Sequence, residues 1–168
     1  MQSKKPYESL ELDVYITKIN QCAFAFCSNL TSITIPDSVT SIGELAFYGC
    51  ENLTSVYISN IVAWCNISFG NYYSNPLCYA KNLYINNELV TKLVIPKTVT
   101  AIKNYAFIYC SNLTSVVIPN SVASIGGLAF YACDNLTIYC EAESQPSGWV
   151  FNWNASNRPV VWGYKAEE

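Results

Sequence analysis

The chain has 168 residues, of which 51% are hydrophobic and 12% are charged, and its formal net charge is −3. High hydrophobicity with so little charge excludes an intrinsically disordered chain. The nine Lys and Arg residues are scattered, which excludes the many phosphate contacts on which nucleic-acid affinity depends. No apolar run approaches the roughly 18 residues that cross a bilayer. We therefore expect one folded domain, with no nucleic-acid partner and no insertion into a membrane.

The chain contains a repeat of 23 residues. Ile19 and Ile42 begin two similar blocks that are 23 residues apart, and Ile102 and Ile125 begin two more with the same spacing. A unit this short cannot bury a core of its own, so it has to stack on further copies of itself. The repeat therefore predicts a solenoid.

Each repeat predicts one β-strand. Leu30, Ile33 and Ile35 form a Leu-x-x-Ile-x-Ile pattern, whose last two apolar positions alternate with the period of a strand. Proline follows this pattern three times and ends the strand, because it has no N–H to donate. We expect a parallel sheet on the order of 25 Å long. Six rows are predicted, at about 7–12, 30–35, 53–58, 90–95, 113–118 and 136–140.

Residues 59–89 are an irregular insert between the third and fourth rows. Its first part, 61–65, we interpret as a helical turn that takes the place of the Ala-Phe-x-x-Cys tract found in the regular repeats. Its last part, 82–87, predicts a strand followed by a tight turn at Asn86 and Asn87.

After the last row the repeat stops, and residues 141–164 carry Trp149, Trp153 and Trp162. The end of a solenoid exposes a layer of core and needs a cap, and three large aromatic side chains suit that role. We expect a single domain over residues 1–164, capped at its C-terminal end, with a short tail at 165–168.

The Ala-Phe-x-x-Cys tract occurs four times and predicts two columns of stacked side chains. The cysteines of such a ladder would be near enough for disulfides, or each would be a small buried hydrophobic group. We favour buried, unreactive free thiols, because an apolar environment suppresses ionisation. The two columns are expected to consist of Phe24, Phe47, Phe107 and Phe130, and of Cys27, Cys50, Cys110 and Cys133.

The tract from Ser38 to Val56 resembles the BspA-type leucine-rich repeat, and the resemblance extends over nearly the whole chain. It implies an α/β-type repeat solenoid, right-handed, with a parallel β-sheet on one face and turns or short helical segments on the other. It also implies a bacterial protein that is secreted or held at the cell surface and is linked to adhesion and host-protein binding. This chain shows neither a signal peptide nor an anchor, so we expect it to be part of a longer parent chain.

The sequence shows no motif of a known catalytic class. The chain has no histidine, the usual base of a nucleophilic site, and it has no Cys-x-x-Cys pair for a metal. A carboxylate pair could serve a glycosidase, but the two acidic clusters, at 8–13 and 141–143, lie at the predicted ends, where charge makes a cap soluble. We expect no catalytic residue, no metal and no cofactor.

Binding is the remaining function. The outward face of the predicted sheet is small and neutral, and Tyr57 is its clear aromatic anchor, with Lys92 on the same face. The insert adds Tyr72 and Tyr73. We predict binding of a host or extracellular protein or a glycan, either through the sheet face around Tyr57 and Lys92 or through the insert around Tyr72 and Tyr73. The alternative is a structural spacer with no ligand of its own, which complete burial of Tyr72, Tyr73, Trp153 and Trp162 would favour.

Overall fold

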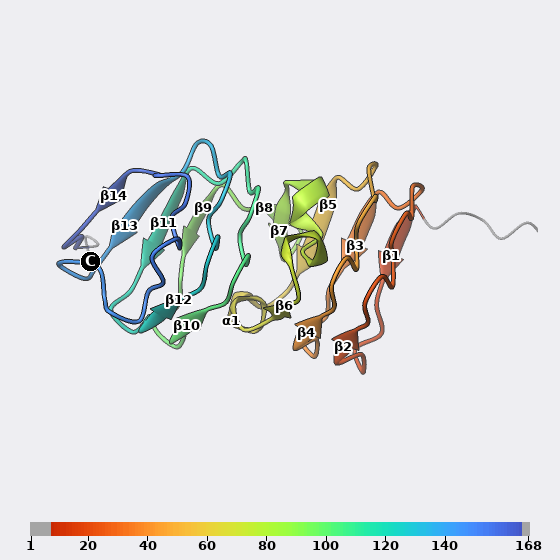
Figure 1. The fold of residues 1–168 in the computed structure, drawn as a ribbon, viewed down its shortest axis with the longest axis horizontal. Helices are drawn as coiled ribbons and strands as arrows, with labels where there is room; N and C mark the ends of the chain where they lie inside the picture. The colour runs from red at the N-terminus through yellow and green to blue at the C-terminus, as the bar shows by residue number, and fades with distance from the viewer. Residues whose placement is uncertain (1–7, 166–168) are drawn as a thin grey trace, which may run out of the picture.

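The structure is a computed structural model that describes residues 8–165, and it confirms the predicted class of fold. Short parallel strands stack row upon row into an elongated solenoid, with the first and last described residues at opposite ends (Figure 1). In the regular rows up to β11 (Ser115–Ile118), paired residues lie 23 positions apart, so that Ile33 pairs with Leu10 on one side and with Val56 on the other. The last regular pairing, between β11 and β13 (Thr137–Cys140), has a spacing of 22. Equivalent apolar side chains therefore stack directly on one another and form one continuous core.

The front face of the solenoid carries the six predicted strands, one further row that lies within the insert, and a last strand in the C-terminal cap. The extra row is β7 (Leu83–Ile85), which pairs in parallel with β5 (Ser55–Ile58) and so continues the stack. The other rows are β1 (Ser9–Glu11), β3 (Ser32–Thr34), β9 (Lys92–Val94), β11 (Ser115–Ile118) and β13 (Thr137–Cys140). The first predicted row began at Tyr7, which lies outside the described residues.

The opposite face carries short strands that the sequence analysis did not predict. They form two parallel sheets and bury one isoleucine or phenylalanine each. A strand of two residues is too short for an alternating pattern, which is why the sequence did not reveal them. These strands are β2 (Lys18–Ile19), β4 (Ser41–Ile42) and β6 (Ser68–Phe69), followed by β10 (Ala101–Ile102) and β12 (Ser124–Ile125).

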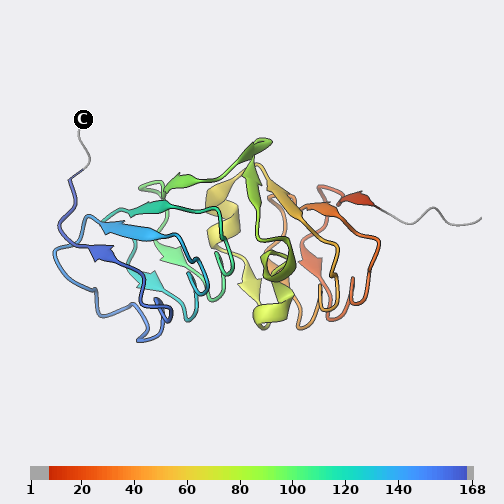
Figure 2. The same cartoon turned by 90° about the horizontal axis from the view of Figure 1, so that it is seen from above.

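The insert contains the helices of the described chain. The helical turn predicted at 61–65 is confirmed as α1 (Ile61–Cys65), but it does not take the place of the Ala-Phe-x-x-Cys tract, as the prediction had it. Helix α1 lies between β5 and β6 in the chain. Because Ser68 of β6 pairs with Ser41 of β4, α1 occupies the position of the loop that follows the proline in a regular repeat. The Ala-Phe-x-x-Cys tract is replaced instead by the 3-10 turn η1 (Tyr72–Ser74) and by α2 (Leu77–Ala80). Figure 2 shows these helices, in yellow and yellow-green, between two groups of strands.

The turn at Asn86 and Asn87 was predicted correctly. Both residues have positive φ, 51° and 68°, which asparagine tolerates better than most residues. They connect β7 to β8 (Glu88–Leu89), which runs antiparallel to β7. The expectation of one continuous front sheet was wrong. The hairpin ends the first front sheet at β8, and a second front sheet begins at β9.

Buried polar side chains hold the two halves of the solenoid together at this break. The indole Nε1 of Trp64 donates to the carbonyl oxygen of Ala106 at 2.8 Å. The amide of Asn75 donates to the carbonyl oxygen of Tyr105 at 2.8 Å, and Asn75 is fully buried. These side-chain hydrogen bonds therefore help to link the two halves where the insert interrupts the strand ladder.

The phenylalanine column is divided in the same way. Phe24 stacks on Phe47 with ring centroids 5.2 Å apart, and Phe107 stacks on Phe130 at 5.5 Å. The insert separates the two pairs, so the single column predicted from sequence was wrong. Phe24 is also only half-buried, because it lies in the first row and is covered on one side only.

The C-terminal cap was predicted correctly. Trp153 packs edge-on against Phe130, with ring centroids 6.2 Å apart and Trp149 beside it. The indole Nε1 of Trp149 donates to the carbonyl oxygen of Val122 at 3.0 Å. Both tryptophans are buried, and Trp162 is half-buried against them. Strand β14 (Val160–Val161) pairs with β13 and closes the front face.

The core makes a direct prediction about stability. Phe47→Ala should lower the free energy of unfolding by about 3–5 kcal/mol, because Phe47 is fully buried and the row on either side prevents collapse of the cavity. Phe24→Ala should cost distinctly less, because Phe24 is half-buried. Urea denaturation followed by circular dichroism measures both values. Equal losses would contradict the register described here.

The break between the two front sheets leads to a second prediction. Asn75→Ala should lower the free energy of unfolding by about 1–3 kcal/mol, because it leaves the Tyr105 carbonyl and the Leu77 N–H without their buried partner. The matched control is Asn120→Ala at an exposed position, which should change stability by less than about 0.5 kcal/mol. If the two variants unfold at the same urea concentration, Asn75 does not hold the halves together.

Candidate functional site

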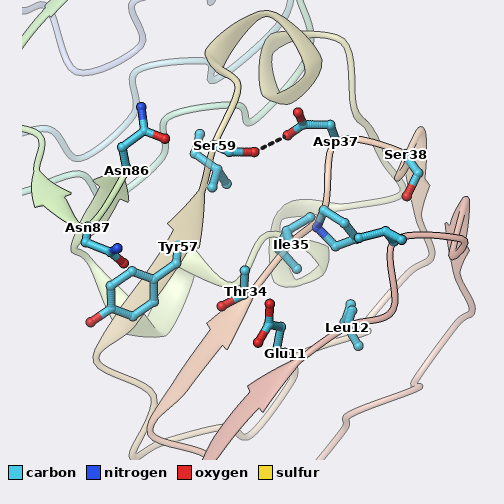
Figure 3. A pocket seen from close by; sticks show the side chains of 13 residues that line it. Glu11, Leu12, Thr34, Ile35, Asp37, Ser38, Tyr57, Ser59, Asn86 and Asn87 are labelled. Atoms are coloured by element: carbon cyan, nitrogen blue, oxygen red, sulfur yellow. Dashed lines mark hydrogen bonds between the residues drawn. The ribbon is translucent and has the colours of Figure 1, made fainter.

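An open groove of about 620 Å³ crosses the carboxyl ends of the front strands β1, β3 and β5 and reaches the turn after β7 (Figure 3). Its floor is apolar, and its rim carries hydroxyl, carboxylate and amide groups. The lining residues are Glu11, Leu12, Val14, Thr34, Ile35, Pro36, Asp37, Ser38, Tyr57, Ile58, Ser59, Asn86 and Asn87.

One register of the sheet supplies the central side chains of the groove. Glu11 pairs with Thr34, Thr34 pairs with Tyr57, and Tyr57 pairs with Tyr84, one residue from each successive row. Residues in register project from the same face of a sheet, so these four side chains form one row across it. The ring of Tyr57 stacks on that of Tyr84, with centroids 4.7 Å apart and an interplanar angle of 24°.

The charge of the groove is acidic. Glu11 and Asp37 contribute carboxylates, whereas the lining contains neither lysine nor arginine. Asp37 accepts a hydrogen bond from the Ser59 hydroxyl at 2.8 Å, which orients its carboxylate at one end of the groove. Asn86 and Asn87, held by their left-handed backbone, place two amides at the other end (Figure 3).

The structure separates the four residues predicted to bind. Tyr57 lies in the groove. Lys92 is exposed on β9, which belongs to the second front sheet. Tyr72 and Tyr73 are half-buried in η1, at the turn that joins the two faces of the solenoid. No single surface therefore contains all four.

Tyr72 and Tyr73 belong to a row of aromatic side chains that runs along the solenoid, which we name the aromatic ridge. Successive rings contact one another with centroids 4.1 to 6.2 Å apart. The ridge consists of Phe26, Tyr48, Tyr73, Tyr72, Tyr109 and Tyr131. Sequence reasoning missed it, although each Ala-Phe-x-x-Cys tract carries one aromatic residue at its two variable positions.

The hydroxyls of the ridge are partly withdrawn from solvent. A hydrogen bond with the Tyr73 hydroxyl, together with burial, raises the pKa of Tyr72 well above its ordinary value. Burial also raises the pKa of Tyr109. Both side chains are therefore neutral at physiological pH, and the ridge is a neutral, largely apolar surface.

All eight cysteines are free thiols, and one of the four ladder positions departs from the prediction. Cys50, Cys110 and Cys133 are buried, and burial raises the pKa of Cys50 to about 11 and that of Cys133 to about 12. Cys27 is exposed, because it lies in the first row, as is Cys22. The expectation of a buried thiol was therefore wrong at Cys27.

Other kinds of site were sought in residues 8–165. Within that range, no three His, Cys, Asp or Glu side chains are grouped so that they could hold a metal ion. None of the helices in the described part of the chain is long and apolar enough to cross a membrane.

A model of the BspA type leucine rich repeat region matches six copies, over residues 2–77 and 78–145. The chain belongs to the BspA-type leucine-rich repeat family. The repeats of this family are generally protein-interaction modules. A comparison with curated proteins found no match.

Solved leucine-rich repeat proteins of bacteria resemble this BspA-type chain. The leucine-rich repeat protein of T. pallidum is 25% identical, with a TM-score of 0.46, and the similarity covers 77% of this chain and 67% of that one. A leucine-rich cell surface protein of Faecalibacterium prausnitzii is 26% identical, with a TM-score of 0.45. That similarity covers 84% of this chain but only 42% of the Faecalibacterium protein.

The thiols of this BspA-type chain make a prediction about reactivity. At pH 8 without denaturant, an alkylating reagent should modify Cys22 and Cys27 rapidly and Cys50, Cys110 and Cys133 slowly, because only the first two are exposed. Mass spectrometry of the peptides measures each rate, and labelling in denaturant is the control in which all eight should react. Rapid labelling of Cys110 in the folded chain would contradict its burial.

Three buried thiols predict a loss of stability at high pH. Burial raises the pKa of Cys65, Cys133 and Cys140 to about 12 in the folded chain, whereas the ordinary cysteine pKa of 9.0 applies in the unfolded chain. Their burial therefore stabilises the fold below pH 9, and this contribution is lost as the pH rises toward 12. Thermal unfolding at pH 8 and pH 10.5 should give a lower Tm at the higher pH.

Proposed function

We propose that this chain is a recognition module of a bacterial cell-surface or secreted protein, and that it binds a host or extracellular protein or glycan without catalysis or cofactor. The groove at Tyr57 is the observation that carries the proposal. It combines an apolar floor, a tyrosine and several convergent polar groups, which is the usual composition of a ligand site.

The rigidity of the groove supports this proposal. Its central residues project from hydrogen-bonded strands, and the Tyr57 ring is held against Tyr84. A ligand that binds such a surface orders few protein side chains, so little of the interaction energy is lost as conformational entropy. With one aromatic anchor in the groove, a single copy should bind weakly, and repetition in a longer parent would supply avidity.

A structural spacer is the second candidate function. The burial of Trp149 and Trp153 favours it, because these tryptophans close the core and leave little surface for a partner. The opposite positions of the two described ends also suit a module that connects neighbours in series (Figure 1). Tyr72 and Tyr73 favour neither candidate strongly, since both are half-buried.

An array of extracellular-matrix proteins and glycans, probed with the multimerised chain, tests the proposal. We expect binding that falls at least about tenfold in Tyr57→Ala, as for an interface anchor. The matched control is Tyr139→Ala, which removes a half-buried tyrosine from the second front sheet and should leave binding unchanged. The double variant Tyr72→Ala with Tyr73→Ala reports on the aromatic ridge.

The outcomes separate the two candidates. Loss of binding in the ridge variant alone would move the site from the groove to the ridge. Absence of binding to every protein and glycan on the array would favour the spacer.

A further inference from the structure

We infer that the groove binds a neutral glycan and that one sugar ring lies over Thr34, between the ring of Tyr57 and the carboxylate of Glu11. The inference rests on the proposed recognition function and names its class of ligand. It is carried by the shape of one recess within the groove, by its chemical groups and by the pairing of the strands beneath it.

The recess results from the order of side chains across three rows. Glu11, Thr34 and Tyr57 are in register on β1, β3 and β5, and neighbouring strands lie about 4.8 Å apart. Tyr57 and Glu11 are thus separated by two strand spacings, roughly 10 Å, with the short side chain of Thr34 between them. Two longer side chains on either side of a short one leave room for a flat, ring-shaped group, and Figure 3 shows the three residues on neighbouring strands.

The Tyr57 ring supplies the wall on which a sugar can stack. Tyr84, in the next row, covers one face of the ring at 4.7 Å. Thr34 lies in the row on the opposite side, so the other face of the ring is turned toward the recess. The electron-rich face of an aromatic ring attracts the weakly positive C–H groups that cover the apolar face of a pyranose.

The polar groups of the recess can bind hydroxyl groups and disfavour negative charge. The Glu11 carboxylate accepts hydrogen bonds, the Thr34 hydroxyl both donates and accepts, and the amides of Asn86 and Asn87 do the same at the rim. Since the lining contains two carboxylates and neither lysine nor arginine, a sialylated, sulfated or phosphorylated ligand would be repelled. The favoured ligand is therefore rich in hydroxyl groups and carries no negative charge.

The strand pairing disfavours an extended peptide as the ligand. A peptide commonly binds a sheet by adding a strand to an open edge. The strands beneath the recess, β3 and β5, are both hydrogen-bonded to neighbours on each side, so their backbone groups are already paired. Recognition above them depends on side chains, which suits a sugar ring better than a peptide backbone.

The experiment is titration of the whole chain with short neutral oligosaccharides of glucose, galactose, mannose or N-acetylglucosamine, followed by calorimetry and saturation-transfer NMR. Sialylated and sulfated counterparts are the matched anionic probes. We expect binding of at least one neutral probe, and weaker binding, by about tenfold or more, of an anionic counterpart that carries the same sugars.

Four variants locate the sugar. Tyr57→Ala should weaken binding at least about tenfold, whereas Tyr57→Phe, which keeps the ring, should stay within about threefold of wild type. Thr34→Tyr fills the recess and should abolish binding with Tyr57 in place. Glu11→Gln, at an exposed position that the fold does not need, should weaken binding about fivefold or more because it removes a charge-assisted hydrogen bond. Tyr139→Ala is the control that should bind normally.

Each result decides between the glycan and the recognition function. Neutral glycan binding that survives both Thr34→Tyr and Tyr57→Ala would overturn the proposed subsite. Binding of extracellular proteins but of no glycan, lost in Tyr57→Ala, would overturn the glycan while the recognition function stands. Failure of every protein and glycan probe to bind would overturn both.

Discussion

Parallel pairing between residues one repeat apart is the interaction on which the rest of the structure depends. Leu10, Ile33 and Val56 occupy successive rows in register, and each covers the equivalent side chain of the row before it. A slip of one residue would turn every apolar side chain of a row toward solvent. The pairing thus fixes the core and, at the same time, which side chains project outward. Among those outward side chains are Glu11, Thr34 and Tyr57, so the candidate site follows from the same register as the core.

The insert is the place where this pairing fails, and it divides the molecule into two halves with different front faces. The first front sheet presents the groove, with its acidic and amide rim. At the equivalent register the second front sheet presents Val94 and Val117 beside Tyr139. Buried Asn75 and Trp64 compensate for the missing ladder by binding backbone carbonyls of the second half. The two halves can therefore differ in surface chemistry while they share one core.

Aromatic residues serve two distinct purposes in this chain. The tryptophans are largely structural, since Trp64 joins the halves and Trp149 and Trp153 cap the end. The tyrosines of the groove and of the aromatic ridge remain accessible in part and carry hydroxyls. The distinction follows from burial, because a tryptophan indole can satisfy its single N–H with one carbonyl inside the core. It explains why the abundance of aromatic residues alone did not locate a binding surface.

The sequence by itself determined the repeat, the inward strand positions and the cap, because the apolar pattern recurs at a constant spacing that only stacking can satisfy. It also singled out Tyr57, because the other outward positions of the predicted strands carry mostly small, neutral side chains. The tertiary structure alone decided that the insert adds a row, that β8 ends the first sheet and that Cys27 is exposed at the first row. It alone brought Glu11, Thr34, Tyr57 and Asn87 to one groove. These residues are separated in sequence by one repeat or more, and their proximity depends on which rows are neighbours.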